Sequence, residues 1–285
     1  MGRDTPAKRL GHAARMKPSP LHARLDAQRI ACRAFGVHLL SDIHERGCDW
    51  RLPLPLGPAR RERIARIADA GLLFVHIPKA AGTSISQALY GFQIKHASIR
   101  LSRRVAGGRL AHLPSFAVLR DPVERFVSAW RYGRAGGGAI HGVADSFRAL
   151  YQGFTMIDDA LDHVEAAGSP FAVDHIFRAQ SWYVSDATGR ITVDRLLTTN
   201  DIPRLPQLIQ GFPDRPVPHL NGSAAADTLP TAEQLARLRR LYAADFALWE
   251  QVRAGRWAAH PSSPVITVAP HRTRIAGHAG LLSSH

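Results

Sequence analysis

The stretch FVHIPKAAGTS, Phe74–Ser84, decides the expected fold. An apolar run ends at Pro78 and Lys79, and two alanines, a glycine and two hydroxyl residues follow at once. This order is typical of a buried strand that leaves a sheet through a tight turn and enters a helix. Such a turn offers backbone N–H groups and a helix N-terminus to an anion. We therefore expect a phosphate-binding turn here.

The turn differs from the common nucleoside-triphosphate loop, GxxxxGK[ST], in the position of its lysine. In that loop the lysine directly precedes the Ser or Thr that binds magnesium, whereas here Gly82 precedes Thr83 and Lys79 lies four residues before Thr83. The small residues, among them Ala81, let the backbone approach a phosphate closely, and Thr83 and Ser84 add hydroxyl donors. The sequence therefore predicts a phosphate site that does not depend on a metal held by Thr83.

A second turn follows the apolar run Ser115–Leu119, in the stretch AVLRDPVERFVSAW. Asp121 is a good N-cap, Pro122 stands at the first helical position, and Glu124 completes a capping-box-like arrangement. These residues predict that a strand ends at Arg120 and that a helix starts directly after it.

Arg120 and Ser128 are the candidate phosphate ligands of this second turn. Arg120 leaves the carboxyl end of its strand, where ligands bind in open α/β sheets. Ser128 lies two helical turns beyond the cap and on the same face of the helix. A guanidinium fork with a hydroxyl suits a terminal phosphate.

Strands and helices alternate along the chain. We expect strands at Leu72–Ile77, Ser115–Leu119 and Ile191–Thr199. We expect helices at Thr83–Tyr90, after Asp121, and near Val143–Gln152, Thr155–Ala167, Ile202–Gly211 and Thr231–Arg253. The order predicts a P-loop-like, three-layer α/β fold with a parallel sheet flanked by helices.

The chain divides into four expected segments. Residues 1–20 are polar and basic and are expected to be disordered, residues 21–70 form an N-terminal extension, residues 71–255 form the main domain, and residues 256–285 form a loose tail. The apolar stripe of the last helix, which includes Leu238, Tyr242 and Trp249, is expected to pack in the core.

Composition narrows the class of protein. The 285 residues carry 37 Lys and Arg against 23 Asp and Glu, a formal charge of +14, which favours anionic partners without naming one. Cys32 and Cys48 form no CxxC pair, so neither a zinc site nor a disulfide framework is expected. The N-terminus has no apolar signal region, and no window is apolar enough to span a membrane. We expect a cytoplasmic protein that could associate peripherally with a membrane.

The stretch HIPKAAGTS resembles the 5′-phosphosulfate-binding loop of the sulfotransferases. The resemblance is closest to the branch that includes carbohydrate sulfotransferases and many bacterial relatives. AVLRDPVERFVSAW is similar to the segment with which the same family binds a 3′-phosphate, and Arg120 and Ser128 match its two phosphate ligands. Later, VPHLNGS looks like the lid segment of the family, which would place Asn221 and Ser223 near the nucleotide. The resemblance covers about residues 70–252.

The resemblance implies an enzyme that moves a sulfuryl group from 3′-phosphoadenosine-5′-phosphosulfate (PAPS) and releases 3′,5′-adenosine bisphosphate (PAP). The acceptor would be a hydroxyl of a carbohydrate, a lipid-linked molecule or a small molecule, and no metal and no nucleic acid would take part. Lys79 would bind the 5′-phosphosulfate and stabilise the charge that develops during transfer. Ala81, Gly82, Thr83 and Ser84 would complete the loop.

The acceptor hydroxyl must lose a proton, and histidine is the natural base near neutral pH. His96, in QIKHASIR, lies between the two turns, at a place where related enzymes carry a catalytic histidine, and it is the preferred candidate. His112, Glu124 and Asp145 stay open as alternatives. His76 lies within the first strand and is expected to be a packing residue.

Two other readings of the sequence compete with a sulfotransferase. A P-loop nucleotide kinase would need magnesium and a GK[ST] triplet, which this turn lacks. A basic protein that binds nucleic acid or another polyanion without catalysis would need clustered basic and aromatic residues on one element. Here the arginines are scattered.

Overall fold

A three-stranded parallel sheet forms the centre of the molecule. The computed structural model describes residues 20–105, 108–138, 142–218 and 229–255. The sheet contains β1 (Leu73–Val75), β2 (Ser115–Leu119) and β3 (Arg195–Thr198), which are adjacent in that order. All three strands are parallel, so their carboxyl ends meet at one edge. The predicted α/β fold with a parallel sheet flanked by helices is confirmed.

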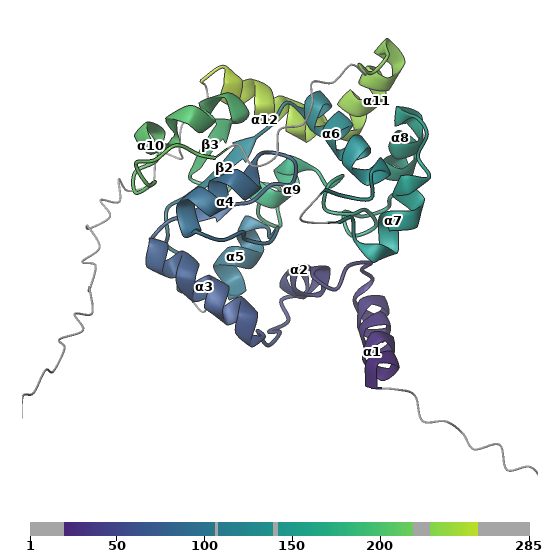
Figure 1. The fold of residues 1–285 in the computed structure, drawn as a ribbon, viewed down its shortest axis with the longest axis horizontal. Coiled ribbons are helices and arrows are strands. Elements are labelled where there is room, and N and C mark those ends of the chain that lie inside the picture. The colour runs from purple at the N-terminus through teal and green to yellow at the C-terminus, as the bar shows by residue number, and fades with distance from the viewer. Residues whose placement is uncertain (1–19, 106–107, 139–141, 219–228, 256–285) are drawn as a thin grey trace, which may run out of the picture.

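Helices surround the sheet and extend to one side of it (Figure 1). Before β1 lie α1 (Pro20–Phe35), α2 (Asp42–Asp49) and α3 (Pro58–Ala70), and between β1 and β2 lie α4 (Gly82–Tyr90) and α5 (Ile99–Val105). Between β2 and β3 lie α6 (Pro122–Arg134), α7 (Asp145–Gln152), α8 (Ile157–Glu165) and α9 (Gln180–Val184). After β3 come the 3-10 helix η1 (Thr199–Arg204), α10 (Leu205–Leu208), α11 (Ala232–Leu241) and α12 (Ala243–Arg253).

The sheet is buried because helices contribute apolar side chains to it. All residues of β1 and β2 are buried, as expected of parallel strands that are covered on both faces. One core cluster joins the strands to α3 through Ile64, to α4 through Ile85 and to α12 through Trp249. The hydroxyl of Tyr90 donates to the carbonyl of Leu72 and accepts from a backbone N–H of β1, which ties α4 to the edge strand.

A second core cluster lies beside the sheet, among α6, α7, α8 and α11. Its centre is aromatic: the Phe177 ring contacts those of Phe126 and Tyr151, with ring centroids 5.5 and 5.1 Å apart. Helix α6 starts at the edge of the sheet and runs into this cluster. The second turn is therefore fixed at both ends, by β2 and by a packed helix.

Three local expectations need correction. The last predicted helix is two helices, because the backbone leaves helical geometry at Tyr242 (φ −115°, ψ 32°), whose buried hydroxyl donates to the carbonyl of Phe177 at 2.6 Å. The third strand begins only at Arg195. Glu124 does not close a capping box, since its carboxylate binds the Arg120 side chain instead.

The N-terminal helices pack on the main domain. Helix α2 contacts α5, and the buried carboxylate of Glu45 accepts from both the backbone N–H and the hydroxyl of Ser98 at 2.8 and 2.7 Å. Asp42 of the same helix forms a bidentate ion pair with the buried Arg178. Polar groups from 21–70 thus reach the interior of 71–255.

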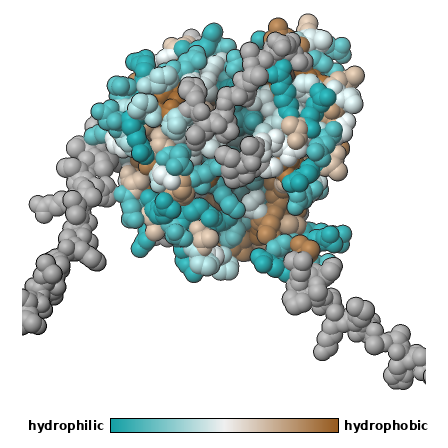
Figure 2. Space-filling model, in the orientation of Figure 1, coloured by the Kyte–Doolittle hydropathy of each residue, from teal (hydrophilic) through white to brown (hydrophobic). Residues whose placement is uncertain are grey.

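The surface is largely hydrophilic on the face shown in Figure 2, with hydrophobic residues gathered toward α1 and α2. Ile30, Leu40 and Trp50 are exposed large hydrophobic residues of this part of the chain. No described helix is long and apolar enough to cross a membrane. The expected disorder of 1–20 and the loose tail from 256 fall on residues outside the described ranges, except for Pro20, which starts α1.

Candidate active site

The turn after β1 has an unusual backbone. Lys79 and Ala81 both have positive φ, at 65° and 59°, a conformation that costs a side-chain-bearing residue energy and recurs at ligand sites. Ala81 is the N-cap of α4, and Gly82 is the first helical residue. Backbone N–H groups in such a turn form a concave site for an anion.

Gly82 is required here by close packing. A Cβ at this position would lie 1.8 Å from Cδ2 of His76, so no larger residue fits without a shift of the ring. His76 in turn hydrogen-bonds through Nδ1 to the carbonyl of Ile94 at 3.1 Å. Its ring therefore lies under the turn and supports it, as expected of a packed residue.

Lys79 lies in a strongly cationic environment. Its Nζ sits 4.1 Å from the centre of the Tyr132 ring, a cation–π contact. Burial, together with the charges of Arg120 and Arg125, lowers the pKa of Lys79 to about 8. Three cations at one place favour an anionic ligand that would neutralise them.

Arg125 supports the first turn through hydrogen bonds. This role was not predicted from the sequence. Its side chain is buried, donates from Nε to the carbonyl of Pro78 at 3.0 Å, and donates from Nη2 to the carbonyl of Arg178 at 2.7 Å. The one available signal was its place in an apolar run, directly before Phe126 and Val127. A charged residue in such a run is buried only when it is well paired.

Arg120 lies beside the first turn. Its Nη1 lies 3.4 Å from the carbonyl oxygen of Lys79, so the two turns meet at one edge of the sheet. Its Nε pairs with Glu124 at 3.2 Å, and Glu124 is largely exposed. Asp121 caps α6 as predicted, since its carboxylate accepts from the backbone N–H groups of Val123 and Glu124.

Gln180 fixes the backbone of Arg120 from α9. Its Oε1 accepts from the Arg120 N–H at 3.0 Å, and its Nε2 donates to the Arg120 carbonyl at 2.9 Å. Asp245 of α12 holds α9 by accepting from the N–H groups of Gln180 and Ser181. No role was predicted for Gln180 from the sequence.

Ser128 completes the second turn. The residue is 7% exposed, and its Oγ is buried without a hydrogen-bond partner among the described residues. A buried hydroxyl without a partner is costly, so a ligand acceptor at this place would stabilise it. A phosphate oxygen would be such an acceptor, and the role of Ser128 stays a prediction.

The hydroxyls of the first turn lie at the start of α4. Thr83 is partly buried and accepts at Oγ1 from the side chain of Gln93 at 3.0 Å, and Ser84 is 8% exposed. Asn221 and Ser223, the expected lid residues, lie outside the described residues.

His96 lies directly beside His76, with ring centroids 4.2 Å apart. Its Nδ1 is 3.2 Å from the carbonyl oxygen of His76. A carbonyl only accepts, so Nδ1 carries the proton, and the neutral ring presents Nε2 as a proton acceptor. Burial, with the neighbouring His76 and His175, lowers the pKa of His96 well below its usual value. The ring is therefore neutral at neutral pH.

A cluster of largely buried polar residues lies next to His96. The His175 ring lies 5.6 Å from that of His96, and its Nε2 is 3.2 Å from Oδ1 of Asp42. Asp42 also accepts from Nη1 and Nη2 of Arg178 at 3.1 and 2.7 Å. This cluster joins α2 to the segment before α9, and it was not predicted from the sequence.

The other base candidates are placed less favourably. His112 is exposed and precedes β2, so the whole length of the strand separates it from Arg120. Glu124 is engaged by Arg120, and Asp145 is 93% exposed beside Arg148. Of the candidates, only His96 lies against the support of the first turn. Within the described ranges, no group of three His, Cys, Asp or Glu residues could hold a metal ion.

Comparison with known proteins gives one match. Residues 63–140 match the model of the sulfotransferase family, and this segment contains both turns, α4, α5 and His96, whereas Asp42, His175, Arg178 and Gln180 lie outside it. The match supports the resemblance to sulfotransferases, while the carbohydrate branch stays a prediction. No curated protein and no solved structure matches the chain significantly.

Proposed function

We propose that this chain, with its sulfotransferase-family segment at 63–140, transfers a sulfuryl group from PAPS to a hydroxyl of an acceptor molecule. One observation carries the proposal: two cationic turns, each suited to a phosphate, meet at one sheet edge with Arg120 Nη1 3.4 Å from the Lys79 carbonyl. A nucleotide with phosphates at both its 3′ and 5′ positions is a ligand that would use both turns.

The first turn would bind the 5′-phosphosulfate. The N–H groups that follow Lys79 and Ala81 would bind its oxygens, with Gly82 allowing close approach. Thr83 and Ser84 would add hydroxyl donors. The Lys79 ammonium would lie near the bridging oxygen, where negative charge grows as the sulfuryl group leaves.

The second turn would bind the 3′-phosphate. The Arg120 guanidinium would give charge-assisted hydrogen bonds, and the Ser128 hydroxyl would gain the acceptor that it otherwise lacks. Gln180 would act as a positioning residue, because it holds the Arg120 backbone at both N–H and carbonyl. Asn221 and Ser223 are proposed to contact the nucleotide from the segment outside the described residues.

His96 would act as the general base. With its Nδ1 proton held by the His76 carbonyl, its Nε2 is free to accept the proton of the acceptor hydroxyl. PAPS supplies an activated sulfuryl group whose bond to the phosphate breaks as the new bond to the acceptor oxygen forms. Positioning and charge stabilisation would supply most of the rate, as in phosphoryl transfer.

The reaction is proposed to need no metal, because Gly82 stands where magnesium-dependent loops carry the lysine that precedes their metal ligand. The acceptor class is proposed as a carbohydrate, a lipid-linked molecule or a small molecule that bears a hydroxyl. Neither nucleic acid nor a membrane-spanning segment has a part in the proposal.

The proposal is tested with PAPS labelled with ³⁵S in its sulfuryl group. The full chain is incubated with the labelled donor and a panel of hydroxyl acceptors, which includes glycans, sterols and phenols, in EDTA and in magnesium. Label is expected to move to at least one acceptor at equal rates in both buffers, and Lys79→Ala should abolish the transfer. A reaction that requires magnesium, or phosphoryl transfer from ATP with no use of PAPS, would contradict the proposal.

A further inference from the structure

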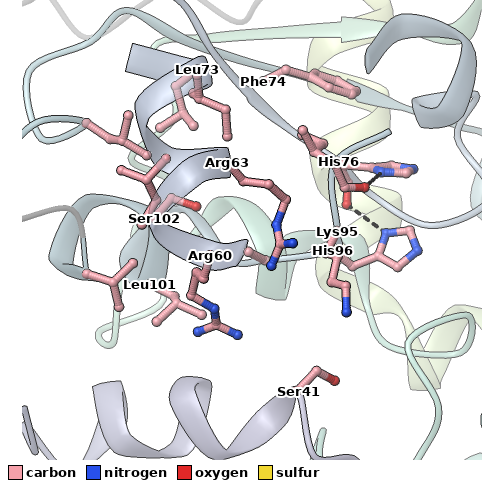
Figure 3. Close-up of a pocket in the computed structure, with 16 residues that line it drawn as sticks. Ser41, Arg60, Arg63, Leu73, Phe74, His76, Lys95, His96, Leu101 and Ser102 are labelled. Atoms are coloured by element: carbon pink, nitrogen blue, oxygen red, sulfur yellow. Dashed lines mark hydrogen bonds between the residues drawn. The ribbon is translucent and has the colours of Figure 1, made fainter. Parts of the chain in front are cut away.

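A cavity lies next to the two histidines, between α3, α5 and the edge strand β1. Its volume is about 90 Å³. In Figure 3 the rings of His76 and His96 lie to the right of the Arg60 and Arg63 side chains, and Leu101 and Ser102 lie to their left. The cavity is thus adjacent to the proposed active site, with which it shares His76 and His96, while Arg60 and Arg63 form another part of its wall.

One part of the cavity wall is apolar. The apolar lining residues come from α3, β1, α5 and the segment after α5, and include Ile64, Ile67, Phe74, Leu101 and Leu110. A wall of this kind favours the hydrocarbon part of a ligand. It is not the polar lining that a sugar would need for its hydroxyls.

The other part of the wall is cationic. Arg60 and Arg63 lie one helical turn apart on α3, and Lys95 lies across from them (Figure 3). Nη1 of Arg60 is buried and has no hydrogen-bond partner among the described residues. Burial and the charge of Arg63 lower the pKa of Arg60. Arg60 as a whole is only half-buried, so its charge is partly desolvated, and an anion bound at Nη1 would stabilise it.

Among the described residues, the buried carboxylate of Glu45 makes no hydrogen bond to Nη1 of Arg60. Glu45 raises the pKa of Arg60 through its charge, but both of its oxygens are bound by Ser98. His44 is a further neighbour, and its pKa is lowered by burial and by the Arg60 charge. The cationic end of the cavity therefore has a local excess of positive charge.

We propose that this cavity binds a small amphipathic anion, with a carboxylate or phosphate monoester head against Arg60 and Arg63. A short apolar body lies against the wall that Ile64, Ile67 and Leu101 form. The site is separate from the one formed by the two turns, so its occupant binds together with the nucleotide rather than in place of it. The inference does not depend on sulfuryl transfer.

Calorimetric titration of the full chain tests the proposal with butanoate, butyl phosphate and butanol as probes, because their chains are short enough for a cavity of this volume. At least one of the two anions is expected to bind about tenfold or more tightly than butanol, as expected for a charge-assisted contact. Saturating PAP should leave the affinity for that anion unchanged. If butanol binds as tightly as both anions, or if PAP displaces the anion, the proposal is wrong.

Matched variants of one helix locate the site. The double variant Arg60→Gln with Arg63→Gln should weaken anion binding about tenfold or more. The control variant Arg61→Gln with Arg66→Gln removes the same charge from exposed residues of α3 and should change the affinity for the anion less than about twofold. Ser102→Phe, which fills the cavity, should abolish binding of the anion. Thermal melting confirms that each variant is folded. Equal loss in both double variants, or retention in Ser102→Phe, would overturn the assignment.

Discussion

The side chain of Gln180 satisfies both backbone polar groups of Arg120, with hydrogen bonds of 3.0 and 2.9 Å. Sixty residues separate the two in the chain. The contact joins α9 to the end of β2 and leaves the Arg120 guanidinium beside the first turn. Placement of the proposed 3′-phosphate ligand therefore depends on a residue that would not itself touch the nucleotide.

Gln180→Leu is expected to weaken PAP binding about tenfold. The substitution leaves the N–H and the carbonyl of Arg120 without their hydrogen bonds, at a cost of about 1–3 kcal/mol of folding free energy each. The second turn is then expected to shift, which displaces the Arg120 guanidinium. Calorimetric titration measures the effect, with a melting curve for stability. Gln87→Leu, at an exposed position of α4, serves as the control and should leave PAP affinity unchanged. Loss of stability in Gln180→Leu with unchanged PAP affinity would show that Gln180 supports the fold but does not position Arg120.

The affinity for PAP should fall as pH rises through about 8. The pKa of Lys79 is lowered to about 8 by burial and by Arg120 and Arg125, and a bound phosphate would raise it again. Below this pH the ammonium is already charged, whereas above it binding must first take up a proton. Titrations at pH 7 and pH 9 in the wild type and in Lys79→Met measure the effect. If the affinity of Lys79→Met for PAP falls between pH 7 and pH 9 as much as that of the wild type, another ionisable group causes the pH dependence and the prediction is wrong.

His96→Gln should lower kcat by a factor of about 10² to 10⁴ with little change in PAP affinity, as expected for loss of a general base. The pKa of His96 is well below its usual value because of burial and the neighbouring His76 and His175. The neutral ring is the active form, so kcat should be constant above about pH 6.5 and decline only in more acidic solution.

The exposed His112 supplies the control for this experiment, and His112→Gln should keep full activity. Steady-state rates between pH 5 and pH 8 give the profile. Full activity of His96→Gln, or an acid limb that starts at or above pH 6.5, would rule out His96 as the base.

Asp42→Asn should destabilise the protein by about 3–5 kcal/mol, since it leaves the charge of the buried Arg178 unpaired. Burial raises the pKa of Asp42, but hydrogen bonds from His175 and Arg178 and their charges lower it overall. The ionised Asp42 therefore stabilises the fold fully above its unfolded pKa of about 4, and this stabilisation is lost as pH falls through the lower, folded value.

Urea unfolding at pH 7 and at pH 3 measures the difference between Asp42→Asn and the wild type, which should shrink in acid. Asp26→Asn, on the exposed face of α1, is the control and should unfold like the wild type at both pH values. A difference that does not shrink at pH 3 would show that the pKa of Asp42 is not lowered.

The two turns could be predicted from the sequence because their signals are local. The strand exit at Pro78 and the cap at Asp121 each depend on a few consecutive residues, and the parallel order of strands then brings both turns to one edge. The prediction of one continuous helix at Thr231–Arg253 was wrong, because the apolar pattern continues past Tyr242 whereas the helix ends there. The Tyr242 hydroxyl donates a tertiary hydrogen bond to the carbonyl of Phe177, which the local sequence does not show.

The supporting residues could not be predicted because their partners are distant in the chain. Asp42 and Arg178 are 136 residues apart, and nothing in either local sequence names the other. The contacts of Gln180 with Arg120 likewise follow from the packing of α9 against β2. The cavity beside His96 depends on side chains from α3, β1, α5 and several connecting segments, so only the assembled fold reveals it.

Calorimetric titration with PAP, with and without magnesium, tests most directly whether the two turns form one nucleotide site. Micromolar binding that is independent of magnesium is expected, with AMP binding at least about a hundredfold more weakly, since it lacks the phosphate that Arg120 and Ser128 would bind. Arg120→Ala should reduce the affinity for PAP to that for AMP. Equal affinity of the wild type for PAP and AMP, or PAP binding that Arg120→Ala leaves unchanged, would contradict a 3′-phosphate site at the second turn.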